Sequence, residues 1–145
     1  MSKHLIWHAD EILNYGAGNF ESRLLLDSKM AGEPCINVNH ITVKAGTSTG
    51  KIDDKGNKSG PAHAKAEIYL CISGKGELWR DGDTCEMRAG SLAYIPGGVG
   101  HYITNLSNTE PLYFLTMWPD EKDNEVWHKR KAAWGEGYET RKMPK

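Results

Sequence analysis

Residues 60–76 of the chain read GPAHAKAEIYLCISGKG, and residues 90–105 read GSLAYIPGGVGHYITN. In the first stretch His63 lies four residues before Glu67, and a glycine turn follows at residues 74–76. In the second, glycine, proline, histidine and asparagine stand at set spacing, at positions 90, 96, 98, 101 and 105. Both stretches combine β-branched and aromatic residues with glycine turns, which predicts short strands that end at tight turns.

Further strands are predicted around these two stretches. The full set covers residues 20–26, 36–45, 66–73, 77–80, 84–88, 91–95, 101–105 and 112–118. The Asp81-Gly82 pair between two of them is a strong hairpin signal. Over 36–45 the alternation of apolar and polar residues changes phase near His40, which indicates a β-bulge or a change of face. Strands spaced about 8–12 residues apart are typical of an all-β sandwich or barrel.

The two stretches resemble the paired motifs of the cupin superfamily. The second matches the family form at every fixed position, while the first has Pro61 where the family usually has its first histidine. The resemblance covers about residues 36–118 and implies an all-β cupin fold, which is a double-stranded β-helix or jelly-roll barrel. We therefore expect one domain over residues 1–145, with its barrel core at about 36–118.

Two imidazoles and one carboxylate on adjacent strands can converge on a metal ion. We predict that His63, Glu67 and His101 bind one divalent metal, with Fe, Mn, Ni, Co and Zn all compatible with this ligand set. Three protein ligands leave coordination positions for water or substrate, as in catalytic sites. Pro61 leaves open whether the metal is retained, and His40 on the preceding strand is an alternative source of a fourth ligand.

The two-residue period of a strand places Tyr69 and Cys71 on the same face as Glu67, lining the barrel below the metal. Lys65 shares the phase of His63 and Glu67, so its ammonium is a candidate for the substrate site. The predicted catalytic residues are therefore Glu67, Tyr69 and Lys65, and no residue is assigned to an organic cofactor.

The first stretch is also similar to the first motif of the small cupin-type glucose-6-phosphate isomerases. The matching residues are Gly60, His63, Lys65, Ala66, Glu67, Tyr69, Gly74, Lys75 and Gly76. This resemblance implies a metal-dependent enzyme for a small polar carbonyl substrate, most simply a sugar or sugar-phosphate isomerase. The metal would polarise the carbonyl, Glu67 would be ligand or base, and Tyr69 and Lys65 would position the substrate. Two alternatives stay open: an Fe(II) dioxygenase with the same ligands, and a non-catalytic cupin that binds a small molecule.

Two further segments complete the prediction. Residues 46–62 are polar except for Ile52 and are expected to form a long loop, which either closes on a phosphate through its lysines or is a solvated surface segment. Residues 120–134 have an acidic start and a basic end, which predicts a C-terminal helix capped by Asp120. Trp118, Trp127 and Trp134 are expected to pack this helix against the barrel.

Composition excludes several classes of function. Eighteen basic and nineteen acidic residues give a net charge of −1, which argues against nucleic-acid or membrane-surface binding. No apolar run is long enough to span a membrane, and the N-terminus does not resemble a secretory signal. Three cysteines, Cys35, Cys71 and Cys85, form no CxxC pair, so reduced thiols in a cytoplasmic protein are expected. The resemblance to cupins and unpaired sheet edges favour a homodimer that acts on a small molecule.

Overall fold

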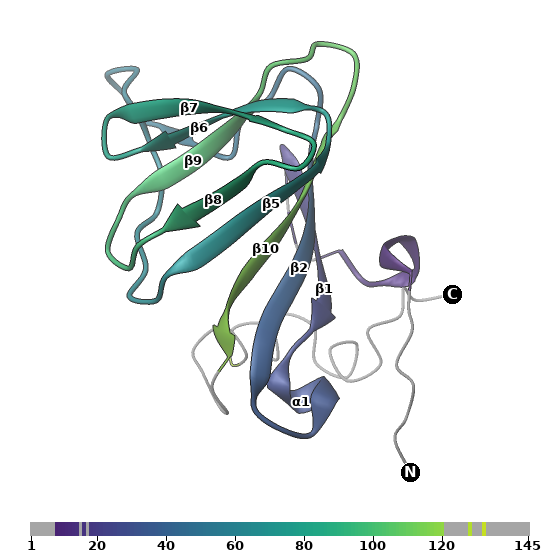
Figure 1. Ribbon diagram of the computed structural model, residues 1–145. Coiled ribbons are helices and arrows are strands. Elements are labelled where there is room, and N and C mark those ends of the chain that lie inside the picture. The colour runs from purple at the N-terminus through teal and green to yellow at the C-terminus, as the bar shows by residue number, and fades with distance from the viewer. Residues whose placement is uncertain (1–7, 15, 17, 121–127, 129–131, 133–145) are drawn as a thin grey trace.

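A computed structural model describes residues 8–14, 16, 18–120, 128 and 132 of the chain (Figure 1). Within them, ten strands follow one another with little helix. In chain order the elements are η1 (Ala9–Glu11), β1 (Phe20–Leu26), α1 (Ser28–Ala31), β2 (Cys35–Val43), β3 (Lys51–Ile52), β4 (Lys58–Ser59), β5 (Glu67–Ser73), β6 (Lys75–Arg80), β7 (Asp83–Arg88), β8 (Leu92–Ile95), β9 (His101–Asn105) and β10 (Leu112–Asp120). The eight strands predicted from sequence are all present, with ends that differ by at most a few residues.

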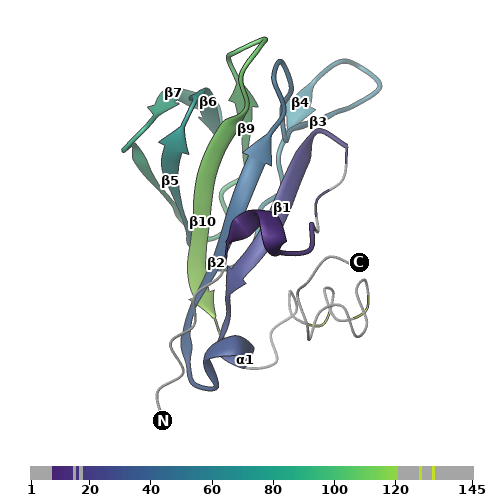
Figure 2. The ribbon, with the colours of Figure 1, turned by 90° about the vertical axis from the view of Figure 1, so that its right-hand side faces the viewer.

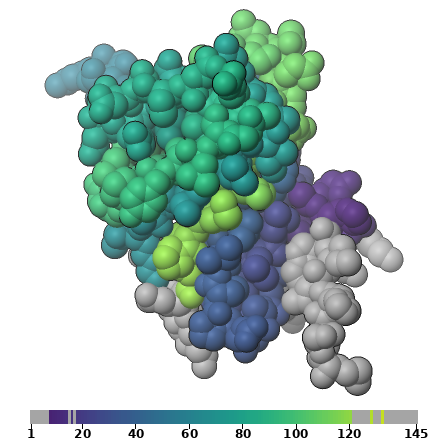
Figure 3. Space-filling model, viewed as in Figure 1, coloured from purple at the N-terminus to yellow at the C-terminus, as the bar shows by residue number. Residues whose placement is uncertain are grey.

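The strands form two principal antiparallel sheets that face each other. One has five strands in the order β1-β2-β10-β5-β8, and the other has three in the order β7-β6-β9. Figures 1 and 2 show the long strands of the first sheet side by side, with β6, β7 and β9 folded over one end. In the space-filling view the teal and green side chains of that end form a continuous surface (Figure 3). The all-β, barrel-like prediction is confirmed, and the sheet includes β1, which precedes the predicted core range.

Buried and more exposed side chains alternate along the whole of β2. Asn37, Asn39, Ile41 and Val43 are all buried, whereas the intervening side chains are more exposed. The predicted bulge at His40 is therefore wrong, and the irregular register lies instead on β1, between Leu24 and Leu26. The apparent change of phase arises because the inward face of β2 carries asparagine at one end and aliphatic residues at the other.

This change of side-chain chemistry divides the barrel interior into two ends. Val43, Leu112 and Phe114 belong to the apolar core, which also contains residues from every strand of the second sheet. At the other end the inward side chains are polar, and they include Asn39, Glu67, His101 and Thr116, all of them buried. An apolar core stabilises the fold by roughly 25 cal/mol for each Å² of apolar surface removed from water, whereas buried polar groups need partners. The polar end is therefore the place to look for a site.

Fixed residues of the second stretch have identifiable backbone roles. Gly98 has φ of +83°, a left-handed conformation that side chains disfavour. The Asn105 amide donates to the carbonyls of Val43 and Glu110, and its oxygen accepts from Ser107 N–H.

The hairpin predicted at Asp81-Gly82 is present between β6 and β7. Asp81 and Gly82 both have positive φ, at +42° and +98°, as a tight hairpin turn requires.

Residues 46–62 are more ordered than the sequence predicted. They contain the β3–β4 hairpin, which Figure 2 shows beside the end of β9. The Asp53 carboxylate closes its turn by accepting from Lys55 and Asn57 N–H, and these bonds, those to Asn57 first, lower its pKa. Ser48 is bridged to Thr104, so the segment is held against the barrel.

The predicted C-terminal helix over 120–134 lies almost entirely outside the described residues and is not supported. Asp120, its expected cap, is the last residue of β10 instead. Its carboxylate accepts from Ser28 N–H at 2.6 Å, so it binds the start of α1. Trp118 belongs to β10 and lines a cavity, while Trp127 and Trp134 fall outside the described residues.

Candidate metal centre

His63, Glu67 and His101 converge at the polar end of the barrel. Glu67 is the first residue of β5, His101 is the first residue of β9, and His63 lies in the segment that leads into β5. Oε2 of Glu67 lies 2.9 Å from Nε2 of His63 and 3.1 Å from Nε2 of His101. One potential ligand atom from each residue lies within 4.8 Å of the others. The three predicted ligands are therefore brought together.

A backbone carbonyl accepts a hydrogen bond from the Nδ1 atom of each imidazole. Nδ1 of His63 lies 2.7 Å from the carbonyl oxygen of Lys65, and Nδ1 of His101 lies 2.9 Å from that of Val99. A carbonyl only accepts, so each Nδ1 carries the hydrogen and the Nε2 atoms face the carboxylate. Two Nε2 lone pairs opposite a carboxylate oxygen require a proton or a cation between them. This donor set fits a divalent metal ion, and the carbonyls orient the ligands as in known metal sites.

Close backbone approach brings the His63 segment against β9. A Cβ atom on Gly60 would lie 1.7 Å from the carbonyl oxygen of His101, so only glycine fits there. The N–H of His101 donates to the carbonyl of Pro61, and the N–H of Gly98 donates to that of His63. The first and second motifs are thereby joined through their backbones directly beside the ligands.

Burial and hydrogen bonding have opposite effects on the pKa of Glu67. Burial raises the pKa of this carboxyl, but the hydrogen bonds with His101 and His63 outweigh it and leave the pKa below 4.5. The hydrogen bond with Glu67 raises the pKa of His63 above 6.5, against the effect of burial. Without a metal, the site is therefore an ion pair around an ionised carboxylate.

Tyr69 and Cys71 follow Glu67 along the same buried face of β5, as predicted. The Tyr69 ring contacts His101 and Phe114, with centroids 5.7 Å and 4.8 Å away. Burial, and secondly the Glu67 charge, hold the pKa of Tyr69 well above 10, so its hydroxyl keeps its proton. Burial also raises the pKa of the Cys71 thiol, which is a property of a core residue rather than of a nucleophile.

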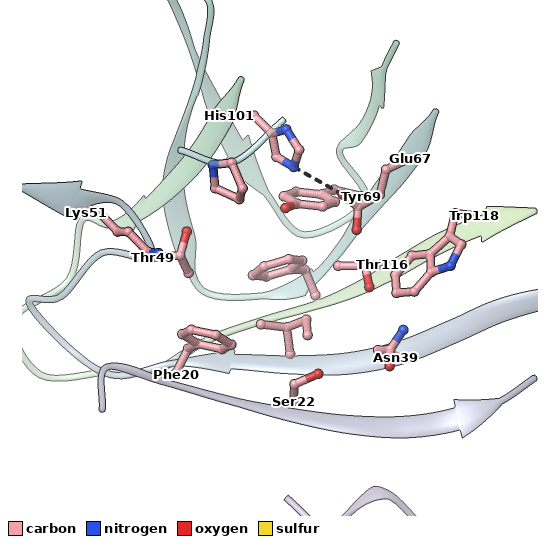
Figure 4. Close-up of a pocket in the computed structure, with 13 residues that line it drawn as sticks. Phe20, Ser22, Asn39, Thr49, Lys51, Glu67, Tyr69, His101, Thr116 and Trp118 are labelled. Carbon is pink, nitrogen blue, oxygen red and sulfur yellow. Dashed lines mark hydrogen bonds and ion pairs between the residues drawn. The ribbon is translucent and has the colours of Figure 1, made fainter. Parts of the chain in front are cut away.

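A cavity of about 280 Å³ opens beside these residues (Figure 4). Its lining consists of Phe20, Ser22, Asn39, Ile41, Thr49, Lys51, Pro61, Glu67, Tyr69, His101, Phe114, Thr116 and Trp118. Lys65 is not among them, and its contribution to the site is the carbonyl that accepts from His63. The sequence analysis did not predict four of these lining residues as part of the site, namely Ser22, Asn39, Thr116 and Trp118. Of these, Asn39 alone had a signal in the sequence, because it is a polar residue at an inward position of the strand predicted at 36–45.

His40 does not face the metal centre. It lies on the outer face of β2, opposite Arg23 on one side and Leu115 on the other. Its ring packs against Tyr113 at 5.6 Å, and burial, with the Arg23 charge second, lowers its pKa. Because side chains alternate along a strand, the predicted alternative of His40 as a fourth ligand is wrong.

Comparison with known proteins agrees with this arrangement. Residues 51–118 match the family model of the cupin domain. These residues are a little under half of the chain, so the match shows a similarity to cupins. Solved structures that resemble it include a predicted oxalate decarboxylase from Thermotoga maritima, with 22% identity and a TM-score of 0.64 over 81% of this chain and 100% of that one. A second is ectoine synthase from P. lautus, which has 23% identity and a TM-score of 0.60 and is similar over 86% of this chain and 85% of that one. A third is an RmlC-like cupin from Shewanella frigidimarina, which has 14% identity and a TM-score of 0.61 and is similar over 84% of this chain and 95% of that one.

One curated protein matches a shorter segment. An uncharacterized protein of Streptomyces coelicolor is 33% identical over 45 residues, which are 31% of this chain. The match spans 43% of that relative's length. The similarity therefore adds nothing about activity, and the likeness to cupins rests on the matched segment and on the shared fold.

Replacement of one ligand should remove the metal without unfolding the barrel. We expect His101→Ala to weaken binding of a divalent ion by about 100-fold or more, since changes to residues around a metal already cost about 10–100-fold. Calorimetric titration with Zn²⁺ measures this change. The matched control is His40→Ala, which should bind Zn²⁺ as the wild type does, and equal binding by both variants would contradict the assignment.

Metal affinity should depend on pH in a definite direction. Protons compete with the ion for Nε2, and the raised pKa of His63 means that protonation begins above the usual value of 6.5. The His63–Glu67 ion pair of the metal-free protein accordingly exists between the lowered pKa of Glu67 and the raised pKa of His63, and it is lost as the pH rises through the latter. We expect the Zn²⁺ affinity to decrease progressively as the pH is lowered toward and below 6.5. An affinity that is constant across this interval would argue against imidazole ligands.

Pro61 lines the cavity, and the resemblance to cupins predicts that it stands where that family usually has its first histidine. We expect Pro61→His to bind Zn²⁺ about tenfold or more tightly, because it adds a fourth ligand beside an existing set of three. Pro61→Ala is the control for loss of the proline ring. Equal affinity in both variants, with the fold intact, would mean that position 61 does not correspond to that ligand.

Proposed function

We propose that this protein is a cupin and a metal-dependent enzyme that acts on a small polar carbonyl compound, most simply as an isomerase of a sugar or sugar phosphate. The observation that carries the proposal is the shared carboxylate oxygen of Glu67 between two imidazoles, at the edge of a cavity. Solved structures named as a predicted oxalate decarboxylase and as an ectoine synthase have a similar fold. A barrel of this kind is thus compatible with enzymes for small polar substrates.

The residues around the cavity have complementary roles in such a reaction. A divalent ion held by His63, Glu67 and His101 would polarise the substrate carbonyl and acidify the neighbouring C–H. Both hydrogen bonds of Glu67 use Oε2, which leaves Oε1 to accept a proton from one carbon and return it to the next. The low pKa of Glu67 keeps this oxygen ionised. Phe20 and Phe114 add aromatic surface to the lining.

Charge within the cavity favours a substrate with an anionic end. Lys51 lines the cavity, and Figure 4 shows it across the site from Trp118. Its ammonium is suited to a phosphate or carboxylate group at that side of the site. Lys65, the other predicted cation, remains a candidate for substrate positioning, although its side chain does not line the cavity.

The ligand set itself favours one second candidate. Two histidines and one carboxylate with open coordination positions are typical of Fe(II) oxygenases, and the ring of Tyr69 adds an aromatic wall beside them. Oxygen consumption by the Fe(II)-loaded protein would identify this activity, whereas an isomerase consumes none.

A screen for proton exchange tests the isomerase proposal. Protein loaded separately with Fe(II), Mn(II), Ni(II), Co(II) or Zn(II) is incubated with sugars and sugar phosphates in D₂O, and NMR follows deuterium uptake beside the carbonyl. We expect uptake that falls by about 10²–10⁴-fold in Glu67→Gln, but not in Glu77→Gln, an exposed carboxylate on β6. Metal content of both variants is measured in parallel, and no uptake with any metal and sugar would refute the proposal.

The homodimer and the cytoplasmic location stay predictions. Leu92 and Tyr94 on the edge strand β8 are 61% and 56% exposed, and light scattering at micromolar concentration measures the oligomeric state directly. Of the residues that the structure describes, none belongs to a helix with the length and apolar character needed to cross a bilayer.

A further inference from the structure

Three hydroxyl groups on three different strands line the cavity. They belong to Ser22 of β1, Tyr69 of β5 and Thr116 of β10. Their residues are only 6%, 8% and 4% exposed, and none of the three hydroxyl oxygens is among the fully enclosed polar atoms left without a hydrogen-bond partner in the described part of the chain. These hydroxyls therefore open onto the cavity, where a ligand can reach them.

Strand register explains how these hydroxyls face one space. Tyr69 is paired with Thr116, and Thr116 is paired with Asn39, in one row across β5, β10 and β2. Ser22 lies opposite Ile41, one inward position farther along β2. Figure 4 shows Ser22 and Thr116 on the wall below the metal ligands, with Tyr69 between them and His101. The hydroxyls therefore lie along one wall of the cavity, which is formed by the five-stranded sheet.

The chemistry of this wall selects among ligands. A hydroxyl both donates and accepts, so a ligand that carries several hydroxyls can satisfy all three groups at once. An apolar ligand would leave them unsatisfied, at the cost of affinity. A carboxylate against this wall would meet no cation there and would lie near the ionised Glu67. Phe20, Ile41 and Phe114 provide an apolar surface for the C–H groups of the ligand.

We propose that Ser22, Tyr69 and Thr116 form a binding subsite for the hydroxyl groups of a polyol-like ligand of about four to six carbons. The size follows from the cavity volume of about 280 Å³, which corresponds to roughly nine water-sized groups at about 30 Å³ each. The proposal deepens the proposed function, since it assigns the polyhydroxylated part of the substrate to this wall. It concerns binding, which is measured independently of turnover.

Equilibrium binding of two five-carbon probes tests the subsite. Xylitol carries a hydroxyl on every carbon, whereas 1-pentanol has the same chain length and one hydroxyl. Calorimetry or ligand-observed NMR on the full chain, with and without Zn²⁺, should show xylitol binding more tightly than 1-pentanol. Thr116→Val and Ser22→Ala, which remove one hydroxyl each, should weaken xylitol binding about tenfold and leave 1-pentanol unaffected or bound more tightly.

Thr42→Val is the matched control. Thr42 lies on the outer face of β2, so the same change there should leave xylitol binding as in the wild type. Tyr69→Phe is a third variant with an intact ring, in case one of the smaller changes disturbs folding. Tighter binding of 1-pentanol, no detectable xylitol binding, or equal xylitol binding by Thr116→Val and Thr42→Val would each overturn the proposal.

The two proposals fail separately in these experiments. If xylitol binds and Thr116→Val weakens it, but no sugar exchanges deuterium, the subsite stands and the isomerase proposal is wrong. If exchange occurs while Thr116→Val changes neither xylitol binding nor the KM of the sugar, the isomerase proposal is supported and the subsite proposal is wrong.

Discussion

The arrangement of this barrel depends on one buried carboxylate. Glu67 is 6% exposed, and a buried charge without partners costs several kcal/mol. His63 and His101 offset that cost from two different parts of the chain, and each is oriented by a backbone carbonyl behind it. The same contact that makes burial of Glu67 tolerable therefore also assembles a set of metal ligands.

The fold provides this contact because antiparallel strands alternate their side chains between two faces. β5 directs Glu67, Tyr69 and Cys71 inward in that order, so the interior changes from charged to polar to apolar along one strand. β2 repeats the gradient, from Asn39 to Val43. An apolar half that stabilises the barrel and a polar half that carries chemistry thus coexist in one small domain.

The three candidate metal ligands were predictable from sequence because short motifs with set spacing determine local geometry. His63 and Glu67 flank the start of one strand, and the second motif places His101 at the start of another. Thr116 and Ser22 carried no such signal, since serine and threonine are equally common on exposed strand faces. The outward orientation of His40 was misread for a related reason. Asn37 and Asn39 are polar but face inward on β2, so the polar residues of this strand did not show which face is exposed.

By itself, the sequence determined an all-β chain with two motifs, a hairpin at Asp81-Gly82 and three candidate ligands. Those features depend on neighbours within a few residues, where turn chemistry and alternation act directly. Only the tertiary structure decided that β1, β2, β10 and β5 lie side by side, and that β1, β5 and β10 each direct a hydroxyl into one cavity. That outcome depends on pairing between segments up to about ninety residues apart, such as Ser28 with Asp120, and on register, which a one-residue shift would reverse.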